Sequence, residues 1–273
     1  MNSSIDPPTR FPQLNRVLDG VVARVQGVLG ADFVGLYMQG SIAIGDFDEH
    51  SDADFVAVTE HPLTDDRVGE LQEMHAQIFD SGEEWAKHLE GSYFPRAVLE
   101  DLSRAGEELW YLDNGQRHMQ RSDHCNTVAV RWIVRERGVR LAGPDPHTLI
   151  GPIPTDVLRE EIRSTIRSWG REILEDPDRY QNRFYQGFIV LNLSRMLHDY
   201  IHGSISSKRT GALWARARFD GSWAGLIDRA WGGRPNPARA VQEPADPDDF
   251  EATLDYVQLI LHDIQRLDSS SGN

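Results

Sequence analysis

The sequence predicts an α/β domain over residues 1–150 and an all-helical domain over residues 151–273. In the first part, short apolar segments alternate with longer amphipathic segments, as in a mixed sheet covered by helices. In the second part, apolar residues recur at helical spacing. Two proline-rich turns, at 143–146 and 151–154, separate the two patterns and mark the domain boundary.

Three segments of the first domain are apolar and bounded by turn residues, and they predict strands at 33–39, 53–59 and 88–94. The spacing of apolar residues between and after them predicts helices at 65–80 and 126–137. We therefore expect a mixed sheet whose strands alternate with helices.

The second domain contains three segments with helical patterns. Residues 156–174 and 182–202 predict two helices, and a third begins at Asp246 and Pro247, where acidic residues fill the first turn. The third helix should pack along one face, because its apolar residues recur at steps of three and four. These residues are Phe250, Leu254, Val257, Leu261 and Ile264.

Composition excludes several classes of function. The 273 residues carry a net charge of −15, with 25 acidic against 13 basic residues in 1–150 and 18 against 15 in 151–273. Such a surface repels long polyanions and disfavours nucleic acid as a partner, while it is compatible with a cationic small molecule. No apolar run approaches the length of a membrane span, so no membrane association is expected.

The chain ends and the cysteine content bear on the compartment. Residues 1–8 contain neither a basic start nor an apolar stretch, so no secretory signal is visible. Cys125 is the single cysteine and has no partner for an internal disulfide, and a small packed side chain is the expected role. We expect a cytoplasmic monomer.

Two aspartates one residue apart, Asp52 and Asp54, follow a Gly40-Ser41 step by about ten residues. In a strand, residues i and i+2 point to the same side, so both carboxylates project together while Ala53 faces the core. Such like charges repel unless a cation neutralises them, and Mg²⁺ with phosphate oxygens suits this pair. The glycine turn opens a short helix and offers N–H groups to phosphates. A solvated Asp-x-Asp loop is the alternative interpretation.

Nucleotidyl transfer also requires a base that removes the proton of the attacking hydroxyl. Glu90 is the candidate, because its segment reads as a strand that can lie beside the strand of the paired aspartates. The alternative is an ordinary surface acid, since Glu83, Glu84 and Glu100 lie nearby in the sequence.

These motifs resemble those of known families. The Gly-Ser turn followed by a paired-acid strand is similar to the hallmark of the nucleotidyltransferase superfamily. Over nearly its whole length the chain resembles the aminoglycoside 3''-adenylyltransferases, the streptomycin and spectinomycin adenylyltransferases. The resemblance is carried by residues 40–41 with 51–54, 89–92, 134–144, 191–195 and 207–215.

The resemblance implies a reaction and its acidic residues. In this family AMP moves from ATP to a hydroxyl of a small molecule, an antibiotic in the resistance enzymes, and pyrophosphate is released. Asp52 and Asp54 would then bind two Mg²⁺ ions, and Glu90 would be the catalytic base.

The resemblance also implies the nucleotide contacts. Gly40, Ser41 and Ser51 would bind ATP together with Arg195 and Lys208 of the helical domain, so that the active site would be an interdomain cleft. Taken without the family, both basic residues have structural alternatives. Asp199 lies one turn after Arg195 as an ion-pair partner, and Lys208 lies in a polar loop before a helix.

The acceptor site is less defined. In the drug-modifying members, acidic and aromatic residues precede the Leu-Ser-Arg segment, and the matching stretch 181–188 offers Gln181 and Tyr185 but no acid. Acids just upstream, Glu175, Asp176 and Asp178, can substitute. A second polar and aromatic segment suggests further acceptor contacts, with a structural cluster under the sheet as the alternative. Its candidates are Trp110 and Asp123, with Tyr111 and His124 beside them.

Two other functions remain open at this point. The acceptor can be a protein side chain or a tRNA end, as in toxin-like nucleotidyltransferases, although the acidic surface disfavours RNA. The protein can also be a nucleotide-binding regulator without catalysis. The complete set of Asp52, Asp54 and Glu90 disfavours a regulator, because a sensor does not need a base.

Overall fold

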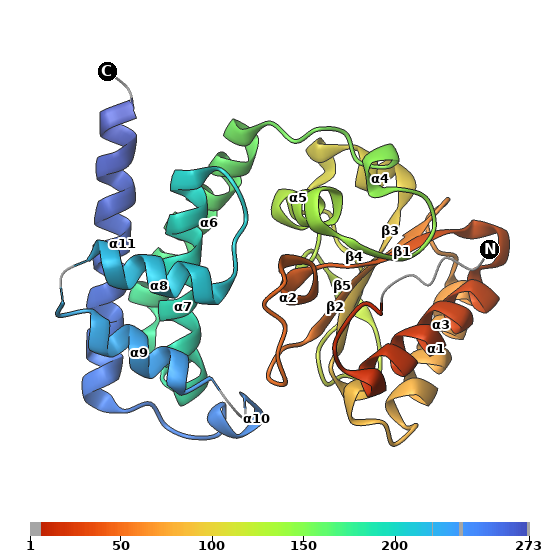
Figure 1. Cartoon of the computed structure of the whole chain (residues 1–273), viewed down its shortest axis with the longest axis horizontal. Coiled ribbons are helices and arrows are strands. Elements are labelled where there is room, and N and C mark those ends of the chain that lie inside the picture. Colours follow the sequence, from red (N-terminus) through yellow and green to blue (C-terminus); the bar gives the residue numbers. More distant parts are fainter. Residues whose placement is uncertain (1–6, 220, 235–236, 272–273) are drawn as a thin grey trace. The chain divides into compact units, whose positions relative to one another are not determined.

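The computed structural model describes residues 7–219, 221–234 and 237–271. The chain divides into two compact units, Met1–Ile153 and Pro154–Asn273, whose elements are labelled in Figure 1. The division falls after Ile153, close to the predicted boundary at residue 150. The predicted combination of an α/β unit and a helical unit is confirmed.

The first unit is built on a six-stranded mixed sheet with the order β5-β4-β3-β2-β1-β6. Among the described strands, β2 and β3 pair in parallel, and the other neighbours pair antiparallel. The strands are β1 Phe33–Met38, β2 Ala53–Thr59, β3 Leu89–Pro95, β4 Leu109–Leu112, β5 Gln120–Ser122 and β6 Val139–Ala142.

Both faces of the sheet are covered, because alternate residues of the central strands enter two separate clusters. Phe55 and Ala57 of β2 pack with buried residues of α1 (Pro12–Leu29) and α3 (Asp65–Phe79). Val56 and Val58 pack on the other face, where α5 (Val128–Arg137) contributes Val134. The face that a strand residue occupies is therefore decided by its position along the strand.

Shorter elements complete the first unit. A tight turn after β1 leads into α2 (Gly40–Ile44), and α4 (Arg96–Glu100) follows β3 directly. Helix α1 is not among the predicted elements, although its buried residues follow helical spacing. They are Leu14, Val17, Leu18, Val21, Val25 and Leu29.

In the described residues of the second unit the regular elements are helices, and one isolated β-bridge joins Asn182 to Pro244. Helix α7 lies at the centre of this unit and contacts α6, α8, α9 and α11. Asn182 and Ser207 cap α7 and α8, since their side chains accept hydrogen bonds from backbone N–H groups of the first turn. The helices are α6 Thr155–Glu175, α7 Arg183–His202, α8 Lys208–Arg218, α9 Ala224–Gly232, α10 Pro237–Ala240 and α11 Pro247–Ser271.

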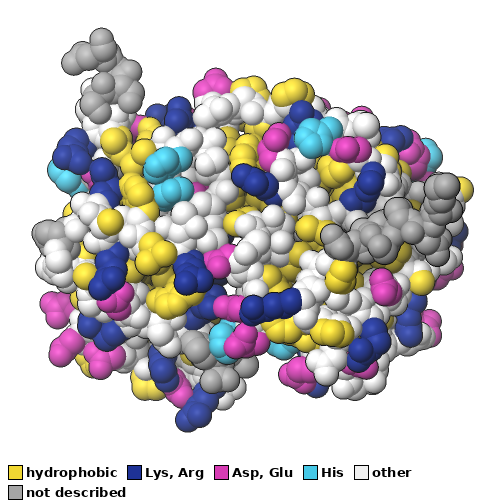
Figure 2. Space-filling view, viewed as in Figure 1, with side chains coloured by type: hydrophobic (Ala, Val, Ile, Leu, Met, Phe, Trp, Pro, Cys, Tyr) yellow, Lys and Arg dark blue, Asp and Glu magenta, His cyan; other side chains and the backbone are white. Residues whose placement is uncertain are grey.

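The surface is charged but mixed. On the face drawn in Figure 2, Lys and Arg side chains are interspersed with Asp and Glu side chains. In the described part of the chain, no helix combines the length and the apolar character that crossing a membrane requires.

Candidate active site

The parallel pair of β2 and β3 brings two of the three candidate acids together. Their register places Asp54 directly opposite Glu90. Residues opposite each other on neighbouring strands project to the same face of a sheet, so the two side chains lie on one face. Ala53 and Phe55, on either side of Asp54, are buried in the opposite face.

Gly91 holds this register, since β2 passes very close to it. A Cβ atom added at Gly91 would lie 2.2 Å from the carbonyl oxygen of Phe55, a distance that real Cβ atoms do not adopt. The residue next to Glu90 must therefore be glycine for the two strands to pair as they do.

The turn after β1 packs directly against Asp54. The Gln39 N–H donates a 2.9 Å hydrogen bond to the Asp54 carbonyl oxygen. Gly40 has a φ of 57°, and a Cβ atom at this residue would lie 2.0 Å from Asp54 Oδ2. Both the backbone conformation and the available space require glycine here. The N-terminus of α2 therefore lies beside the carboxylate of Asp54.

Two serines of the nucleotide motif lie in this region. Ser41 is in the first turn of α2, and its carbonyl oxygen accepts from the N–H groups of Gly45 and Asp46. Ser51, just before β2, donates its hydroxyl hydrogen to Asp48 Oδ1 over 3.0 Å. The hydroxyl of Ser51 thus stabilises the turn that leads into the Asp52 segment.

Asp52 precedes β2 by one residue and is held by a loop beyond β4. Asn114 Nδ2 donates a 2.7 Å hydrogen bond to Asp52 Oδ1. The other atom of this amide, Oδ1, is buried and has no hydrogen-bond partner among the described residues. A buried acceptor without a donor destabilises the protein. An additional N–H or O–H group that donates to Asn114 Oδ1 would remove this cost.

Strand β4 and the segment after β5 supply the partners of Glu90, whose side chain is 14% exposed. Tyr111 donates its hydroxyl hydrogen toward Glu90 Oε1 at 2.8 Å and toward Asp113 Oδ1 at 3.0 Å. His124 Nε2 lies 3.4 Å from the same oxygen of Glu90. Hydrogen bonding to Glu90 raises the pKa of His124, and burial followed by the charge of Glu90 raises that of Tyr111.

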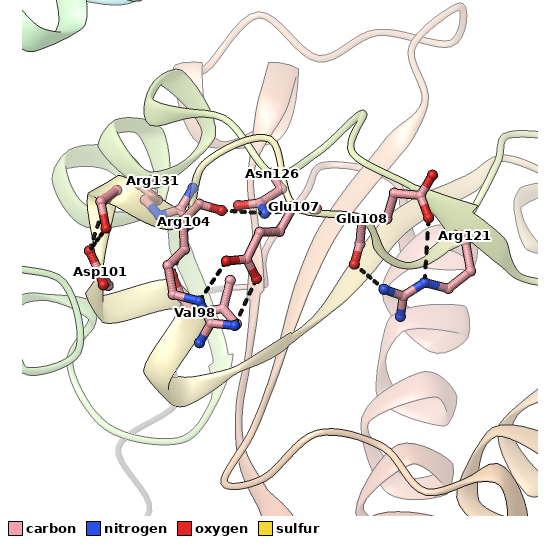
Figure 3. Close-up of polar contacts among 9 residues, drawn as sticks. Val98, Asp101, Arg104, Glu107, Glu108, Arg121, Asn126 and Arg131 are labelled. Atoms are coloured by element: carbon pink, nitrogen blue, oxygen red, sulfur yellow. Dashed lines mark hydrogen bonds and ion pairs between the residues drawn. The ribbon is translucent and has the colours of Figure 1, made fainter.

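The segment between α4 and α5, which carries β4 and β5, is held by side-chain hydrogen bonds to backbone oxygens (Figure 3). Asn126 Nδ2 donates to the carbonyl oxygens of Arg104 and Glu107, at 2.9 and 2.7 Å. Arg131 is fully buried and donates to the carbonyl oxygen of Val98 at 2.8 Å. Asn126 thus pairs two carbonyl oxygens of the irregular segment, and Arg131 pairs a carbonyl oxygen of α4.

The donor chemistry suits a hard divalent ion, but the geometry is not that of an assembled metal cage. Asp52 and Asp54 provide carboxylate oxygens, which Mg²⁺ prefers. Throughout the described ranges, no three His, Cys, Asp or Glu side chains form a group arranged to hold a metal ion. The three acids thus divide into the opposed pair of Asp54 and Glu90 and the amide-bound Asp52.

Trp110 lies on the other face of the sheet from the carboxylates. It packs against the cluster of α1 and α3, whereas Tyr111, the next residue on β4, reaches Glu90. The guanidinium of Arg121 lies 5.7 Å from the Trp110 ring, and Arg121 also contacts Glu108 (Figure 3). Asp123 is exposed in the turn after β5. The structure therefore brings Tyr111 and His124 to the acids, and not Trp110.

In the helical unit, Arg195 and the start of α8 lie close together. A Cβ atom added to Gly211 would lie 2.4 Å from Arg195 Cα, so α7 and α8 pack closely at this point. Arg195 Nη2 donates to Asn192 Oδ1 at 3.0 Å, and Lys208, the first residue of α8, lies with Nζ 5.0 Å from the Phe188 ring.

Asp199 accepts hydrogen bonds from the loop before α8. Its Oδ1 accepts hydrogen bonds from the N–H and the hydroxyl of Ser206, at 3.0 and 2.6 Å. Burial raises the pKa of Asp199, and these hydrogen bonds together with the charge of Arg195 counteract that rise. Arg195 thus donates a hydrogen bond to Asn192, and its charge also lowers the pKa of Asp199, as the structural alternative for Arg195 expects.

The acceptor candidates of this unit lie at the start of α7. Gln181 is exposed and follows a short 3-10 turn, while Tyr185 is half-buried within a group of rings. Its ring centroid lies 5.0 Å from that of Tyr180 and 5.3 Å from that of Phe184. An aromatic surface with polar edges is a common feature of sugar and drug sites.

Three comparisons with known proteins bear on this arrangement. Residues 148–262 match the family model described as aminoglycoside adenylyltransferase, C-terminal domain. A 93-residue stretch is 30% identical to the aminoglycoside (3'') (9) adenylyltransferase of Rhizobium radiobacter, covering 34% of this chain and 32% of that protein. The enzymes of the same name from Klebsiella pneumoniae and Escherichia coli are also 30% identical over 93 residues, and 33% of their length is covered.

The chain resembles the aminoglycoside adenylyltransferases. Its match spans about a third of the length of these curated relatives. The fold extends the likeness further, to the crystal structure of the spectinomycin adenyltransferase AAD(9) from Enterococcus faecialis with ATP and spectinomycin. That match has a TM-score of 0.67 at 15% identity and covers 90% of this chain and 98% of the other. The adenylyltransferase resemblance inferred from the motifs is confirmed.

Proposed function

We propose that the protein is a Mg²⁺-dependent adenylyltransferase that moves AMP from ATP to a hydroxyl group of an aminoglycoside-like small molecule. The observation that carries the proposal is the register of Asp54 with Glu90 beside the Gly40 turn. The names of the similar proteins support the same reaction, since they include aminoglycoside adenylyltransferases and a spectinomycin adenyltransferase solved with ATP.

Asp52 and Asp54 would hold the metal, in a set of two ions. Their carboxylate oxygens fit Mg²⁺, and the partnerless Asn114 Oδ1 fits an additional donor such as a metal-bound water. When bound, Mg²⁺ neutralises phosphate charge and lowers the pKa of a coordinated hydroxyl. Gly40 keeps the turn close enough to Asp54 for backbone N–H groups to hold phosphate oxygens beside it.

Glu90 would be the general base. The O–H bond of the acceptor breaks, its oxygen bonds to the α-phosphorus of ATP, and Glu90 takes the proton while pyrophosphate leaves with the electron pair of the broken P–O bond. Half-burial supports this role, because a carboxylate partly removed from water interacts strongly with a nearby hydroxyl.

For the nucleotide we propose the residues that the motifs indicate. Gly40, Ser41 and Ser51 belong to the motif around Asp54, and Arg195 and Lys208 would neutralise phosphate oxygens. The close packing of α8 on α7 at Gly211 supports a joint role for the two cations. For the acceptor we propose Gln181, Tyr185 and the exposed Asp123, whose carboxylate can attract a cationic drug. The reaction would take place in the cytoplasm, and we propose that one chain suffices.

The test is an assay with α-³²P-labelled ATP, Mg²⁺ and a panel of spectinomycin, streptomycin, a protein mixture and tRNA. We expect a labelled small molecule and release of pyrophosphate, and no product when EDTA removes the metal. Label on protein or tRNA would support a toxin-like enzyme instead. Binding of ATP without any transfer across the panel would indicate a regulator.

Matched variants assign the roles. Glu90→Gln should lower kcat about 100-fold or more, since a general base contributes roughly two to four orders of magnitude. Asp54→Asn should abolish turnover and its response to Mg²⁺ concentration. Glu73→Gln, a change of an exposed acid on α3, is the control and should keep full activity. Substantial activity of Asp54→Asn would remove this residue from the metal site.

A further inference from the structure

The hydroxyl group of Tyr111 lies between two carboxylates. Its oxygen is 2.8 Å from Glu90 Oε1 and 3.0 Å from Asp113 Oδ1. The side chain stands on β4, which pairs with β3 so that Tyr111 lies opposite Ser92, two residues after Glu90. Tyr111 is therefore placed by the sheet itself, and not by a loop.

This hydroxyl carries one hydrogen and can donate it to one carboxylate at a time. Tyr111 is buried, with 3% of its surface exposed, and burial next to Glu90 raises its pKa. It therefore remains an O–H donor at neutral pH. A hydrogen bond from a neutral donor to a carboxylate is stronger than one between two neutral groups.

Both polar contacts of Glu90 within the described residues are made to the same oxygen, Oε1, by Tyr111 and by His124. The contact with His124 is longer, at 3.4 Å, and its ring is 65% exposed, so Tyr111 is the stronger of the two. With Oε1 held in this way, the other oxygen of Glu90, Oε2, is the one that can receive a proton.

We propose that Tyr111 is a positioning residue for Glu90. Its hydrogen bond to Oε1 selects the side-chain conformation of Glu90 in which Oε2 faces the acceptor hydroxyl. Asp113 competes for the same hydrogen and sets how firmly Glu90 is held. The proposal rests on the proposed function, because it gives Tyr111 a role through the base of that reaction.

The kinetic test compares Tyr111→Phe with Tyr93→Phe. Tyr93 is an equally buried tyrosine on β3 whose hydroxyl contacts His75 and not Glu90, so it is a matched control. We expect Tyr111→Phe to lower kcat about tenfold with the KM for ATP unchanged, because a misplaced base slows the chemical step without weakening substrate binding. Tyr93→Phe should keep kcat within about twofold on the same reasoning.

Asp113→Asn separates the two possible acceptors of the hydroxyl hydrogen. If Glu90 is the acceptor that matters, removing the charge of Asp113 leaves kcat at or above that of the unmodified protein. A loss of kcat equal to that of Tyr111→Phe would show that Tyr111 acts through Asp113, and would overturn the proposal.

A double-mutant cycle on stability tests the contact without any activity. Urea unfolding is measured for Tyr111→Phe, Glu90→Ala and the double variant, and the cycle is repeated with Tyr93→Phe in place of Tyr111→Phe. We expect non-additive effects for Tyr111 with Glu90 and additive effects for Tyr93 with Glu90. Additivity in the first cycle overturns the proposal. Absence of transfer by the unmodified protein would instead refute the proposed function, while the cycle would still decide whether Tyr111 holds Glu90.

Discussion

His75 predicts a specific loss of stability in mild acid. Its side chain lies within the core beneath the sheet, with Nε2 2.8 Å from the Tyr93 hydroxyl oxygen. Its Nδ1 is buried and without a hydrogen-bond partner among the described residues. Burial lowers the pKa of His75 from 6.5 to about 4, because no partner nearby favours the charged imidazolium.

The direction in which pH changes the free energy of unfolding depends on whether the folded or the unfolded state binds the proton. Well above pH 6.5 the histidine is neutral in both the folded and the unfolded protein, so there it has no effect on the pH dependence of stability. Between pH 6.5 and pH 4 only the unfolded chain binds the proton, and the free energy of unfolding falls as the pH falls. At pH 5 this loss amounts to about 2 kcal/mol relative to pH 7, for a folded pKa of about 4.

The assay is native-state hydrogen exchange of the β2 and β3 amides, which reports the opening of the first unit by itself. The quantity compared is the free energy of opening at pH 7 minus that at pH 5. In His75→Gln the amide cannot titrate, so this difference should be about 2 kcal/mol smaller than in the unmodified protein. His262→Gln, which changes an exposed histidine of α11, should leave the difference as it was. Equal differences in His75→Gln and the unmodified protein would refute the reasoning.

Three glycines give further predictions. Gly40→Ala should destabilise the first unit by about 1–2 kcal/mol and reduce the proposed adenylyl transfer. The left-handed φ of 57° and the short distance to Asp54 both disfavour a side chain at this residue. Urea unfolding measures the first effect and the labelled-ATP assay the second. Gly211→Ala should cost about 1–3 kcal/mol by forcing α8 away from Arg195, and thermal unfolding would show it as a lowered Tm. Gly69→Ala is the helix control, since nothing lies within 4 Å of the added Cβ, and should stabilise the protein by about 0.5–1 kcal/mol. A Gly211→Ala variant as stable as Gly69→Ala would contradict the close packing of α8.

Much of the fold follows from local patterns in the chain. The strands predicted at 33–39, 53–59 and 88–94 agree with β1, β2 and β3 to within a residue or so at each end. They are recognisable because they are buried on both faces and bounded by turn residues. The helix predicted at 126–137 corresponds to α5, Val128–Arg137, whose N-cap Thr127 accepts a hydrogen bond from the Val130 N–H.

The surroundings of Glu90 depend on contacts that no local pattern contains. Whether β4 lies beside β3, and in which register, decides that Tyr111 reaches Glu90 while Trp110 packs on the other face. The alternation along Leu109–Leu112 requires that these neighbours point to opposite faces, but it does not say which face holds the acids. Asn114 illustrates the same point, since its contact with Asp52 joins residues 62 positions apart.

The close approach of Gly91 to Phe55 has a consequence for how this protein can diversify. Glu90 cannot move along β3 without disturbing the buried core. A shift of the strand by one residue would place every side chain of β3 on the opposite face of the sheet. Mutations that change the acceptor of the proposed reaction are therefore expected to accumulate in the helical unit and in the turns after β4 and β5. In laboratory evolution, libraries aimed at those positions should retain far more folded members than libraries aimed at residues 89–92.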